Sequence, residues 1–438
     1  MTTAVEVAPG ACTRVPEDPA LPQLALALDS RRMTPLLEEL HGKGAAASWR
    51  VRYVRYKPVT NCIVLYEAIT AAETPVWAYA KLFAQDRAPR PSDEHRLSTY
   101  LPELRMALSA FPRDLQMPAL RLAMAPEGSS RILRRVVPKF ERDRFRSHWG
   151  AWEPLRYKPE RRCVMKGSHL TAGGDVARHY ARFYAGPEGA ATANWHRHFS
   201  SLDRDAAAEV RTPALIGYSE EFRVLLIEEL SGRPLRLFFD GTGGPCEDAI
   251  ARTAKALTAW HRLPAPAGLP GTPPVAEQAD ISARAIAALL PEAAQLCVEL
   301  AQALARTAPP AVEQPSLLHG DFYYDQVLIR DGEVAGVLDL DELCAGDPLH
   351  DVAVFCAHLR ELEVREISAG RAEWISSLFT SAYEAATGGG LSRRGLAWRL
   401  GAALLTLATS SFRRFDQDWP RQVHNLLQQA AAAVDTAC

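Results

Sequence analysis

An eight-residue motif that occurs twice constrains the fold of this chain more than any other feature of its sequence. Residues 55–62 read RYKPVTNC, and residues 156–163 read RYKPERRC, 101 positions later. The likeness continues without a gap, because AYAKLFA around Lys81 aligns with HYARFYA around Arg182. Self-similarity at a fixed offset is the signature of a repeated structural unit. The sequence therefore predicts two copies of one supersecondary unit.

Weaker similarity extends both copies toward their C-terminal ends. Residues 117–136 read MPALRLAMAPEGSSRILRRV, and residues 212–230 read TPALIGYSEEFRVLLIEEL. We interpret these segments as equivalent parts of the two copies, with a shorter spacing after the motif in the second copy.

Short runs rich in β-branched and aromatic residues predict a small antiparallel sheet in each copy. The runs cover residues 62–69 and 76–84 in the first copy, and residues 155–159 and 223–230 in the second. In each copy we expect the order strand, tight loop, strand, strand, helix and hairpin.

After Gly232 the pattern becomes helical. Residues 246–263 carry apolar side chains at helical spacing, and a Pro/Gly-rich linker separates them from the helical segment 281–305. Three further segments carry Ala and Leu stripes that are typical of helices packed in a core: 373–386, 394–415 and 420–434.

Length and composition predict an α+β protein with more than one lobe. The chain has 438 residues, of which 47% are hydrophobic, so it can bury a large core. We expect an N-terminal helical extension (1–48), a first copy of the sheet unit (49–150), a second copy (151–232) and a helical lobe (233–438).

Charge and cysteine usage exclude several functional classes. Lys plus Arg number 50 and Asp plus Glu number 52, so a net charge of −2 offers no field for nucleic acid or an anionic membrane. The eight cysteines lie far apart, and no segment resembles a signal peptide or a membrane span. We therefore expect a cytoplasmic protein with reduced thiols, without nucleic-acid or membrane partners.

The segment LLHGDFYYDQVLI, residues 317–329, places polar groups between two apolar runs. The second run continues through an Asp-Gly turn into residues 333–342, which predicts a β-hairpin inside the helical lobe. Such a hairpin can hold Asp321, Gln326 and Asp339 near one point. Carboxylates brought together repel one another unless a cation or proton intervenes, and Mg²⁺ prefers oxygen ligands together with substrate phosphates. The alternative is a hairpin tip with solvated aspartates.

The same segment resembles the aminoglycoside phosphotransferase family, which also contains choline kinases and has a protein-kinase-like fold. The resemblance rests on His319-Gly320-Asp321, Gln326 where Asn is usual, Leu338-Asp339, Gly346-Asp347-Pro348 and Asp351. It covers roughly residue 155 to the C-terminus. It implies a bilobal fold with a small antiparallel nucleotide lobe and a mostly helical C-terminal lobe, preceded here by the extra copy of the sheet unit.

The resemblance also implies a role for each matched residue. Asp321 matches the catalytic position that orients or deprotonates the acceptor hydroxyl. Asp339 matches the aspartate that holds Mg²⁺ against the phosphates, and Gln326 falls on the second metal ligand. Structural support of the site is expected from three residues: His319, Asp347 and Asp351.

The nucleotide lobe departs from the usual family pattern. Its first loop, KPERRC, contains no glycine, so we expect Arg161 and Arg162 to supply positive charge to the phosphates. Arg182 stands where the family has a phosphate-pairing lysine, whereas the first copy has Lys81 there. We place nucleotide contact on Arg182, with Lys81 as the opposing possibility. The sequence places no clear acidic partner for Arg182 on the following helix, and Glu209 is only a candidate.

The leading hypothesis is an ATP-type phosphotransferase, with GTP also possible, that uses Mg²⁺ and acts on a hydroxyl of a small molecule. The alternatives are a peptide or protein Ser/Thr kinase, and a nucleotide-binding pseudokinase or scaffold. The acceptor stays open, because acidic and aromatic residues both follow the catalytic motif. A homodimer is possible, with the first sheet copy as one candidate interface.

Overall fold

The structure, a computed structural model, describes residues 14–42, 48–70, 75–87, 99–125, 127–137, 145–149, 152–171, 175–202, 210–240, 243–366, 368 and 370–437. Contacts divide the chain into two compact units. The first unit comprises Met1–Phe111, Ile281–Glu299 and Ala408–Gln428; the second comprises Pro112–Asp280, Leu300–Leu407 and Gln429–Cys438. No described helix is long and apolar enough to cross a membrane.

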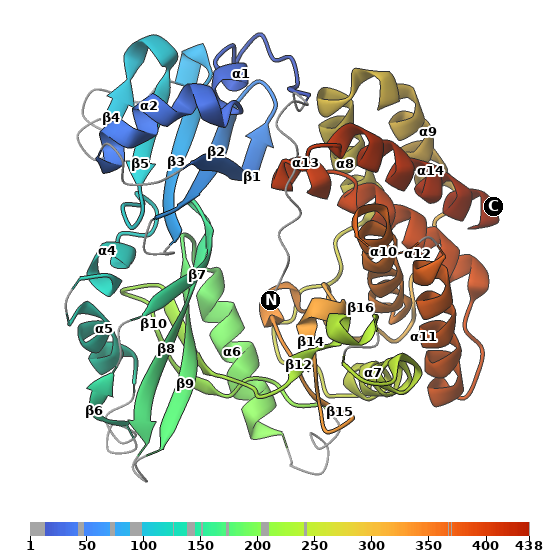
Figure 1. Cartoon of the computed structure of the whole chain (residues 1–438). Helices are drawn as coiled ribbons and strands as arrows, with labels where there is room; N and C mark the ends of the chain where they lie inside the picture. Colours follow the sequence, from blue (N-terminus) through green and yellow to red (C-terminus); the bar gives the residue numbers. More distant parts are fainter. Residues whose placement is uncertain are drawn as a thin grey trace. The chain divides into compact units, whose positions relative to one another are not determined.

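The first unit contains a five-stranded antiparallel sheet in the order β1-β2-β3-β5-β4. Its strands are β1 (Trp49–Lys57), β2 (Asn61–Ile69), β3 (Pro75–Phe83), β4 (Thr99–Leu101) and β5 (Met106–Ala110). Helices α1 (Leu24–Ala27) and α2 (Ser30–His41) precede it and are drawn in blue in Figure 1. The strands predicted at residues 62–69 and 76–84 are confirmed.

Helical segments from later in the chain complete the first unit. They come from α8 (Val275–Leu289), α9 (Ala294–Arg306), α13 (Ser410–Arg414) and α14 (Trp419–Ala437). Phe412 of α13 packs edge-on against Tyr56 of β1, with ring centroids 6.2 Å apart. It also meets the fully buried ring of Trp419. The predicted helix over 281–305 is interrupted at Pro291, which cannot continue a helix interior.

The second unit repeats the same sheet. Its strands are β6 (Phe145–Trp149), β7 (Glu153–Lys158), β8 (Arg162–Thr171), β9 (Val176–Tyr184), β10 (Leu215–Ser219) and β11 (Val224–Glu228), with α6 (Glu188–Ser201) between β9 and β10. The order β7-β8-β9-β11-β10 matches that of the first unit, and β6 adds to the other end of β8. The predicted duplication is confirmed at the level of topology.

The two sheets also agree residue by residue. Lys81 pairs across the sheet with Ile63, and Arg182 pairs with Val164, each 101 residues further on. The tight turns after β1 and β7 each hold a non-glycine residue in the left-handed region, with φ of 52° at Val59 and 54° at Glu160.

The predicted equivalence of residues 117–136 and 212–230 is wrong. The first segment forms α4 (Ala119–Ala123) and α5 (Gly128–Val136), whereas the second forms the strands β10 and β11. A helix starts near residue 117 because the Asp114 carboxylate accepts the backbone N–H groups of Gln116 and Met117. The shared Pro-Ala-Leu letters carried too little information to separate the two structures.

The true counterpart of this helical segment precedes the first sheet. Asp18 accepts the hydroxyl of Tyr56 at 2.8 Å, and Asp114 accepts the hydroxyl of Tyr157 at the same distance. Each aspartate therefore ties a short helix pair to the strand that carries the repeated motif. The structural repeat begins with these helices rather than with the strands.

The boundary between the first and second units lies earlier in the chain than the sequence predicts. The contact-based division falls after Phe111, so residues 112–150, predicted to belong to the first copy, group with the second sheet. Gly217 of β10 shows why, since a Cβ there would lie 2.3 Å from the carbonyl oxygen of Val136. Helix α5 packs directly against the second sheet at that point.

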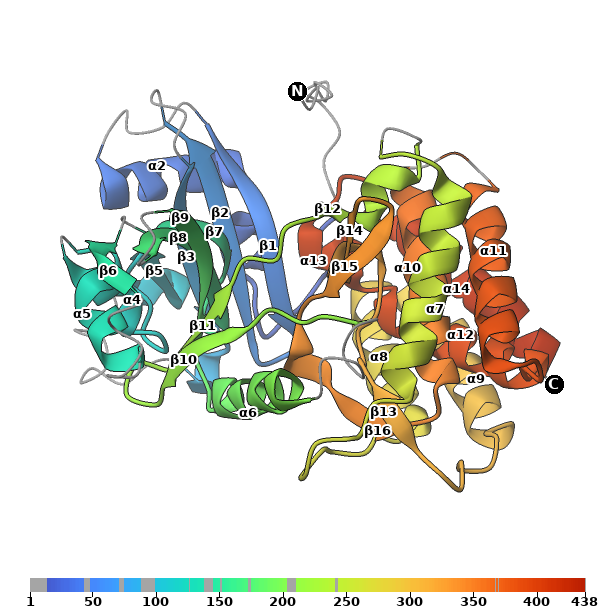
Figure 2. The same cartoon turned by 90° about the horizontal axis from the view of Figure 1, so that it is seen from below.

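The helical part of the second unit contains α7 (Cys246–His261), α10 (Leu349–Arg365), α11 (Arg371–Thr387) and α12 (Arg393–Leu407). Figures 1 and 2 show α7 beside α11, and α10 contacts both α11 and α12. Aromatic rings fill the interior, where Phe355 stacks on Phe379 with centroids 4.0 Å apart. The predicted helical character of this region is confirmed.

Two small sheets interrupt these helices. One pairs β12 (Arg233–Pro234), β14 (Val327–Arg330) and β15 (Glu333–Val337), and the other pairs β13 (Ser316–Leu318) with β16 (Cys344–Gly346). Asp331 and Gly332 form the turn between β14 and β15, with φ of 54° and 81°. Two left-handed residues are what a tight hairpin turn requires. The predicted hairpin is confirmed.

Candidate active site

Gln326 and Asp339 lie together at the base of the β14–β15 hairpin. Gln326 ends the turn η6 (Tyr324–Gln326), and Asp339 precedes the turn η7 (Leu340–Glu342). The N–H of Leu338 donates to the carbonyl of Gln326 at 2.8 Å, which fixes the two segments side by side. Both side chains line a cavity of about 710 Å³.

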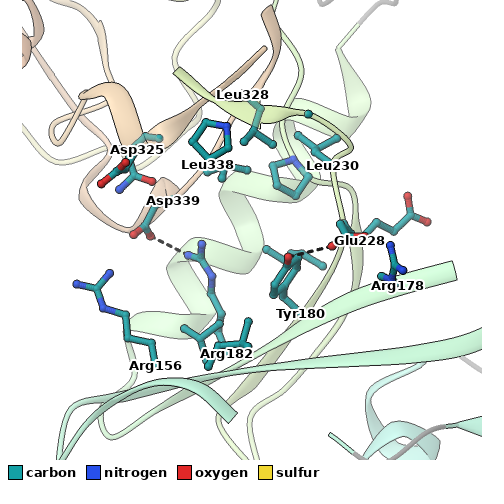
Figure 3. Close-up of a pocket in the computed structure, with 18 of the residues that line it drawn as sticks. Arg156, Arg178, Tyr180, Arg182, Glu228, Leu230, Asp325, Leu328, Leu338 and Asp339 are labelled. Carbon is teal, nitrogen blue, oxygen red and sulfur yellow. Dashed lines mark hydrogen bonds and ion pairs between the residues drawn. The ribbon is translucent and has the colours of Figure 1, made fainter. Parts of the chain in front are cut away.

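Two arginines from the second sheet meet Asp339 in this cavity. Arg182 Nη1 lies 2.7 Å from Asp339 Oδ1, and Arg162 Nη1 lies 3.4 Å from the same oxygen. Figure 3 shows Arg182 directed at Asp339, with Arg156 beside it. Burial raises the pKa of Asp339, but the arginines lower it further, so the net pKa falls well below its usual range. Asp339 is therefore ionised.

A second carboxylate, Asp341, completes this charge cluster. It forms an ion pair with Arg162, and its Oδ1 lies 3.6 Å from Arg182 Nη1. The hydroxyls of Tyr184 and Thr192 both donate to Asp341 at 3.0 Å. The partners of Asp341 come from β8, β9 and α6, which are distant in sequence, so local sequence patterns do not predict this role.

Helix α6 offers Arg182 no carboxylate. The side chains that α6 places nearby are Thr192 and the fully buried His196, and burial followed by the charge of Arg182 lowers the pKa of His196 to about 4. The candidate partner Glu209 lies outside the described residues. In this structure Asp339 and Asp341 balance the Arg182 charge instead.

The cavity lining also includes a group of apolar side chains, against which a flat ring could pack. These apolar side chains come from the large sheet of the second unit, from the segment after β11 and from the β14–β15 hairpin: Leu155, Val164, Ile227, Leu230, Leu328 and Leu338. Tyr180 lies on the same face of β9 as Arg182 and donates its hydroxyl to Glu229 at 3.0 Å. The cavity thus combines an apolar slot with a charged end.

Only one of the two arginines predicted in the loop before β8 lines this cavity. Arg162, the first residue of β8, lines it, whereas Arg161 lies in the preceding turn with an exposed side chain and is not among its lining residues. Arg156 of β7 lines it but was not predicted, although it belongs to the repeated RYKP motif. Lys81 lies in the first unit, 5.6 Å from the centre of the Phe83 ring.

Asp321 faces a second cavity, of about 460 Å³. Its side chain is 41% exposed, and Oδ1 lies 3.5 Å from Nε2 of His358 on α10. Besides Asp321, three acidic residues line this cavity: Asp341, Glu342 and Asp347. Residues 320–342 thus contribute to both cavities: Asp339 lines the first, and Asp321 and Asp341 line the second.

Asp351 braces the loop that carries Asp321. It is fully buried, and its carboxylate accepts the N–H groups of His319 at 2.7 Å and Gly320 at 2.9 Å. The ring of His261 approaches the same carboxylate at 3.1 Å. Gly320 needs a φ of 81°, and a Cβ there would lie 2.0 Å from the carbonyl oxygen of Glu342. Only glycine fits that position.

His319 and Asp347 each join two elements of the site. Nε2 of the buried His319 lies 2.7 Å from the carbonyl of Leu338, next to Asp339. Asp347 accepts the N–H of Leu349, the first residue of α10, and pairs with Arg399 of α12 at 2.6 Å. Each contact thus joins the segment that carries the residue to a second element, and a supporting role in the site stays a prediction.

Residues 170–387 match the phosphotransferase enzyme family. Through this segment, the chain belongs to that family. The match includes the helix α10, the loop that carries Asp321 and the β14–β15 hairpin. As a family member the chain is a phosphotransferase that acts on an alcohol group. No curated protein sequence matches the chain.

Solved structures of phosphotransferases are similar to this chain in fold. A choline kinase from Cryptosporidium parvum is 11% identical, with 70% of this chain and 96% of that chain covered and a TM-score of 0.50. An aminoglycoside phosphotransferase from Streptomyces rimosus, in complex with ADP and streptomycin, is 21% identical, with 64% and 99% covered and a TM-score of 0.41. The similarity to the choline kinase shows a shared protein-kinase-like fold.

Proposed function

We propose that the chain transfers the γ-phosphoryl group of a nucleoside triphosphate, ATP in the first instance, to a hydroxyl of a small molecule. The observation that carries the proposal is that Asp339 and Asp321, from one short segment of the chain, line two separate cavities. One cavity is lined by apolar side chains and by several arginines. The apolar side chains suit a nucleobase, and the arginines suit its phosphates. The other presents Asp321 to a separate molecule.

Mg²⁺ fits the residues at the charged end of the first cavity. Asp339 is ionised and shares the cavity with the amide of Gln326, and these oxygen donors would hold the ion together with phosphate oxygens. Bound there, Mg²⁺ would neutralise charge on the β- and γ-phosphates. The described residues contain no cluster of three His, Cys, Asp or Glu, so the phosphates and water must supply the other ligands.

Every bond and proton in the proposed transfer can be accounted for. The acceptor O–H bond breaks and its proton passes to a carboxylate oxygen of Asp321, while the acceptor oxygen forms a bond to the γ-phosphorus. The bond between that phosphorus and the bridging oxygen breaks, and the nucleoside diphosphate leaves with the electron pair. Arg162 and Arg182 remain positively charged throughout and are placed to stabilise the phosphate oxygens.

We propose a positively charged small molecule as the acceptor. Four acidic side chains line the second cavity, and two of them are already in ion pairs, Asp347 with Arg399 and Asp341 with Arg162, which leaves Asp321 and Glu342. The remaining carboxylates attract a cation and repel a phosphorylated or acidic acceptor. A volume of about 460 Å³ suits a compact molecule, which favours this reading over a peptide or protein kinase.

A transfer assay with labelled nucleotide tests the proposal. The protein is incubated with Mg²⁺ and γ-labelled ATP or GTP, and with a panel of amino alcohols, aminocyclitols, neutral sugars and a Ser/Thr peptide mixture. We expect label transfer to a cationic alcohol. Labelled peptide alone would favour the protein kinase alternative, and nucleotide binding without transfer to any acceptor would favour the pseudokinase.

A further inference from the structure

His358 lies between two carboxylates at the edge of the acceptor cavity. Its Nε2 is 3.5 Å from Oδ1 of Asp321, and its Nδ1 is 3.5 Å from Oε2 of Glu361, one turn further along α10. The ring also stacks on Tyr323, with centroids 4.1 Å apart and planes inclined by 16°. Both nitrogens and one face of the ring are therefore engaged.

The burial of His358 and Glu361 bears on whether the imidazole carries a positive charge. The side chain of His358 is 11% exposed and that of Glu361 only 6%, whereas Asp321 is 41% exposed. A buried carboxylate needs a positive partner, and the ring is the group that Glu361 meets one turn earlier. Burial lowers the pKa of His358, but Asp321 and Glu361 raise it more, so the net pKa lies above its ordinary value of 6.5.

We propose that His358 is a positioning residue for the catalytic aspartate, holding Asp321 Oδ1 so that Oδ2 faces the acceptor hydroxyl. The inference rests on the function proposed above and names a residue that the phosphotransferase motif does not contain. His358 acts through Asp321 and keeps both of its ring protons during transfer. The proton from the hydroxyl goes to Asp321 Oδ2 and is released to water with the product.

The arrangement matters because the contact with His358 is the ion pair that the described residues offer the Asp321 carboxylate. It is the most exposed member of the trio, and a carboxylate on a loop rotates unless a donor fixes one oxygen. Misplacing a reacting group by about 1 Å can cost on the order of 100-fold in rate. The imidazole is held in turn by Glu361 on the same helix and by the ring of Tyr323, so Asp321 is tied through His358 to α10.

The sign of the expected pH dependence follows from the groups around the ring. From the catalytic loop these are Asp321, Tyr323, Tyr324 and Asp325, and from α10 the group is Glu361. The imidazolium donates to both carboxylates below its pKa. As pH rises through that pKa the ring loses one proton and one of the two contacts, so kcat should fall on the alkaline side.

The test compares His358→Ala and His358→Gln with the unaltered full-length chain. We expect Ala to lower kcat by about 10- to 100-fold while the nucleotide Kd stays within about twofold, because the nucleotide cavity does not include His358. Gln keeps an N–H donor but cannot titrate. It should therefore recover much of kcat and lose the alkaline limb that depends on His358.

Two further variants separate positioning from loss of stability. Arg360→Ala, on the same helix as His358, removes an ion pair to Glu373 of α11 and should leave kcat unchanged. Glu361→Gln removes one carboxylate that raises the pKa of His358, so the alkaline limb should move to lower pH. If His358→Ala unfolds, the Gln and Glu361 variants still decide the matter through their pH profiles.

An unchanged kcat in a folded His358→Ala variant would overturn the inference, as would an unaltered alkaline limb in both His358→Gln and Glu361→Gln. Failure of the proposed function gives a different pattern. In that case Asp321→Asn is as active as the unaltered chain, or no acceptor is phosphorylated by any variant.

Discussion

Arg182 Nη1 lies 2.7 Å from Asp339 Oδ1, so the residue assigned to the phosphates is bound to the residue assigned to the metal. Burial lowers the pKa of Arg182, but Asp339 and its neighbours raise it more. Both groups are therefore charged, and they neutralise each other before nucleotide binds. When Mg²⁺ and nucleotide bind, the contact between Arg182 and Asp339 must be replaced by contacts of Arg182 with phosphate and of Asp339 with Mg²⁺.

The first prediction concerns Arg182 and its counterpart in the first sheet. Arg182→Ala should weaken nucleotide binding by roughly 10- to 100-fold, because a charge-assisted contact to phosphate contributes about 1.5 to 3 kcal/mol. Lys81→Ala is the matched variant at the equivalent strand position and should bind nucleotide normally. Titration calorimetry measures both. A large loss in the Lys81 variant alone would mean that the first copy supplies the phosphate contact.

The second prediction concerns Asp339. Asp339→Asn keeps the shape of the side chain and removes the charge, so Mg²⁺-nucleotide affinity should fall by about tenfold or more. Nucleotide binding without Mg²⁺ should fall much less, because Arg182 is then freed from its carboxylate. Equal Mg²⁺ and nucleotide affinity in the variant and the unaltered chain would exclude Asp339 as a metal ligand.

The third prediction concerns Gln326, which stands where the family usually has Asn. Gln326→Asn should not raise kcat, because the Leu338–Gln326 backbone contact holds the hairpin at the spacing that the longer side chain fills. Steady-state kinetics at saturating Mg²⁺ checks this. A large gain in turnover would show that Gln326 is a defect of the site and would favour the pseudokinase.

The fourth prediction concerns Asp351 and pH. Burial raises the pKa of Asp351, but the hydrogen bond and charge of His261 lower it more, so the net pKa is below its usual value. A depressed pKa adds stability above the unfolded pKa, and that stability is lost as pH falls through the folded pKa. Asp351→Asn should therefore lower Tm clearly at pH 7 and much less at pH 3. An equal loss at both values would contradict the charge-based account.

The hairpin could be predicted from sequence because its information is local. An Asp-Gly pair between two apolar runs specifies a tight turn, and Gly320 and the His-Gly-Asp order specify the loop before it. The strands of both copies were predictable for the same reason, since strand patterns alternate over a few residues. Positions fixed by such local rules need no knowledge of distant segments.

Residues brought together by tertiary contact could not be predicted in this way. Asp341 reaches Arg162 and Thr192 only because three elements converge, and His358 reaches Asp321 from a helix that begins 28 residues later. Which of Arg161 and Arg162 faces the cavity could have been predicted from strand alternation. Successive side chains on a strand face opposite sides, so the residue in phase with Val164 is the one that faces the cavity.

The most direct test of the whole account is phosphoryl transfer by Asp321→Asn, measured in a single turnover with bound Mg²⁺-nucleotide and an acceptor from the panel. The substitution removes the carboxylate that takes the hydroxyl proton without changing the size of the side chain. We expect transfer to fall by at least about 100-fold, with nucleotide affinity and Tm close to those of the unaltered chain. Transfer at the unaltered rate in a folded, nucleotide-bound Asp321→Asn variant would contradict the account.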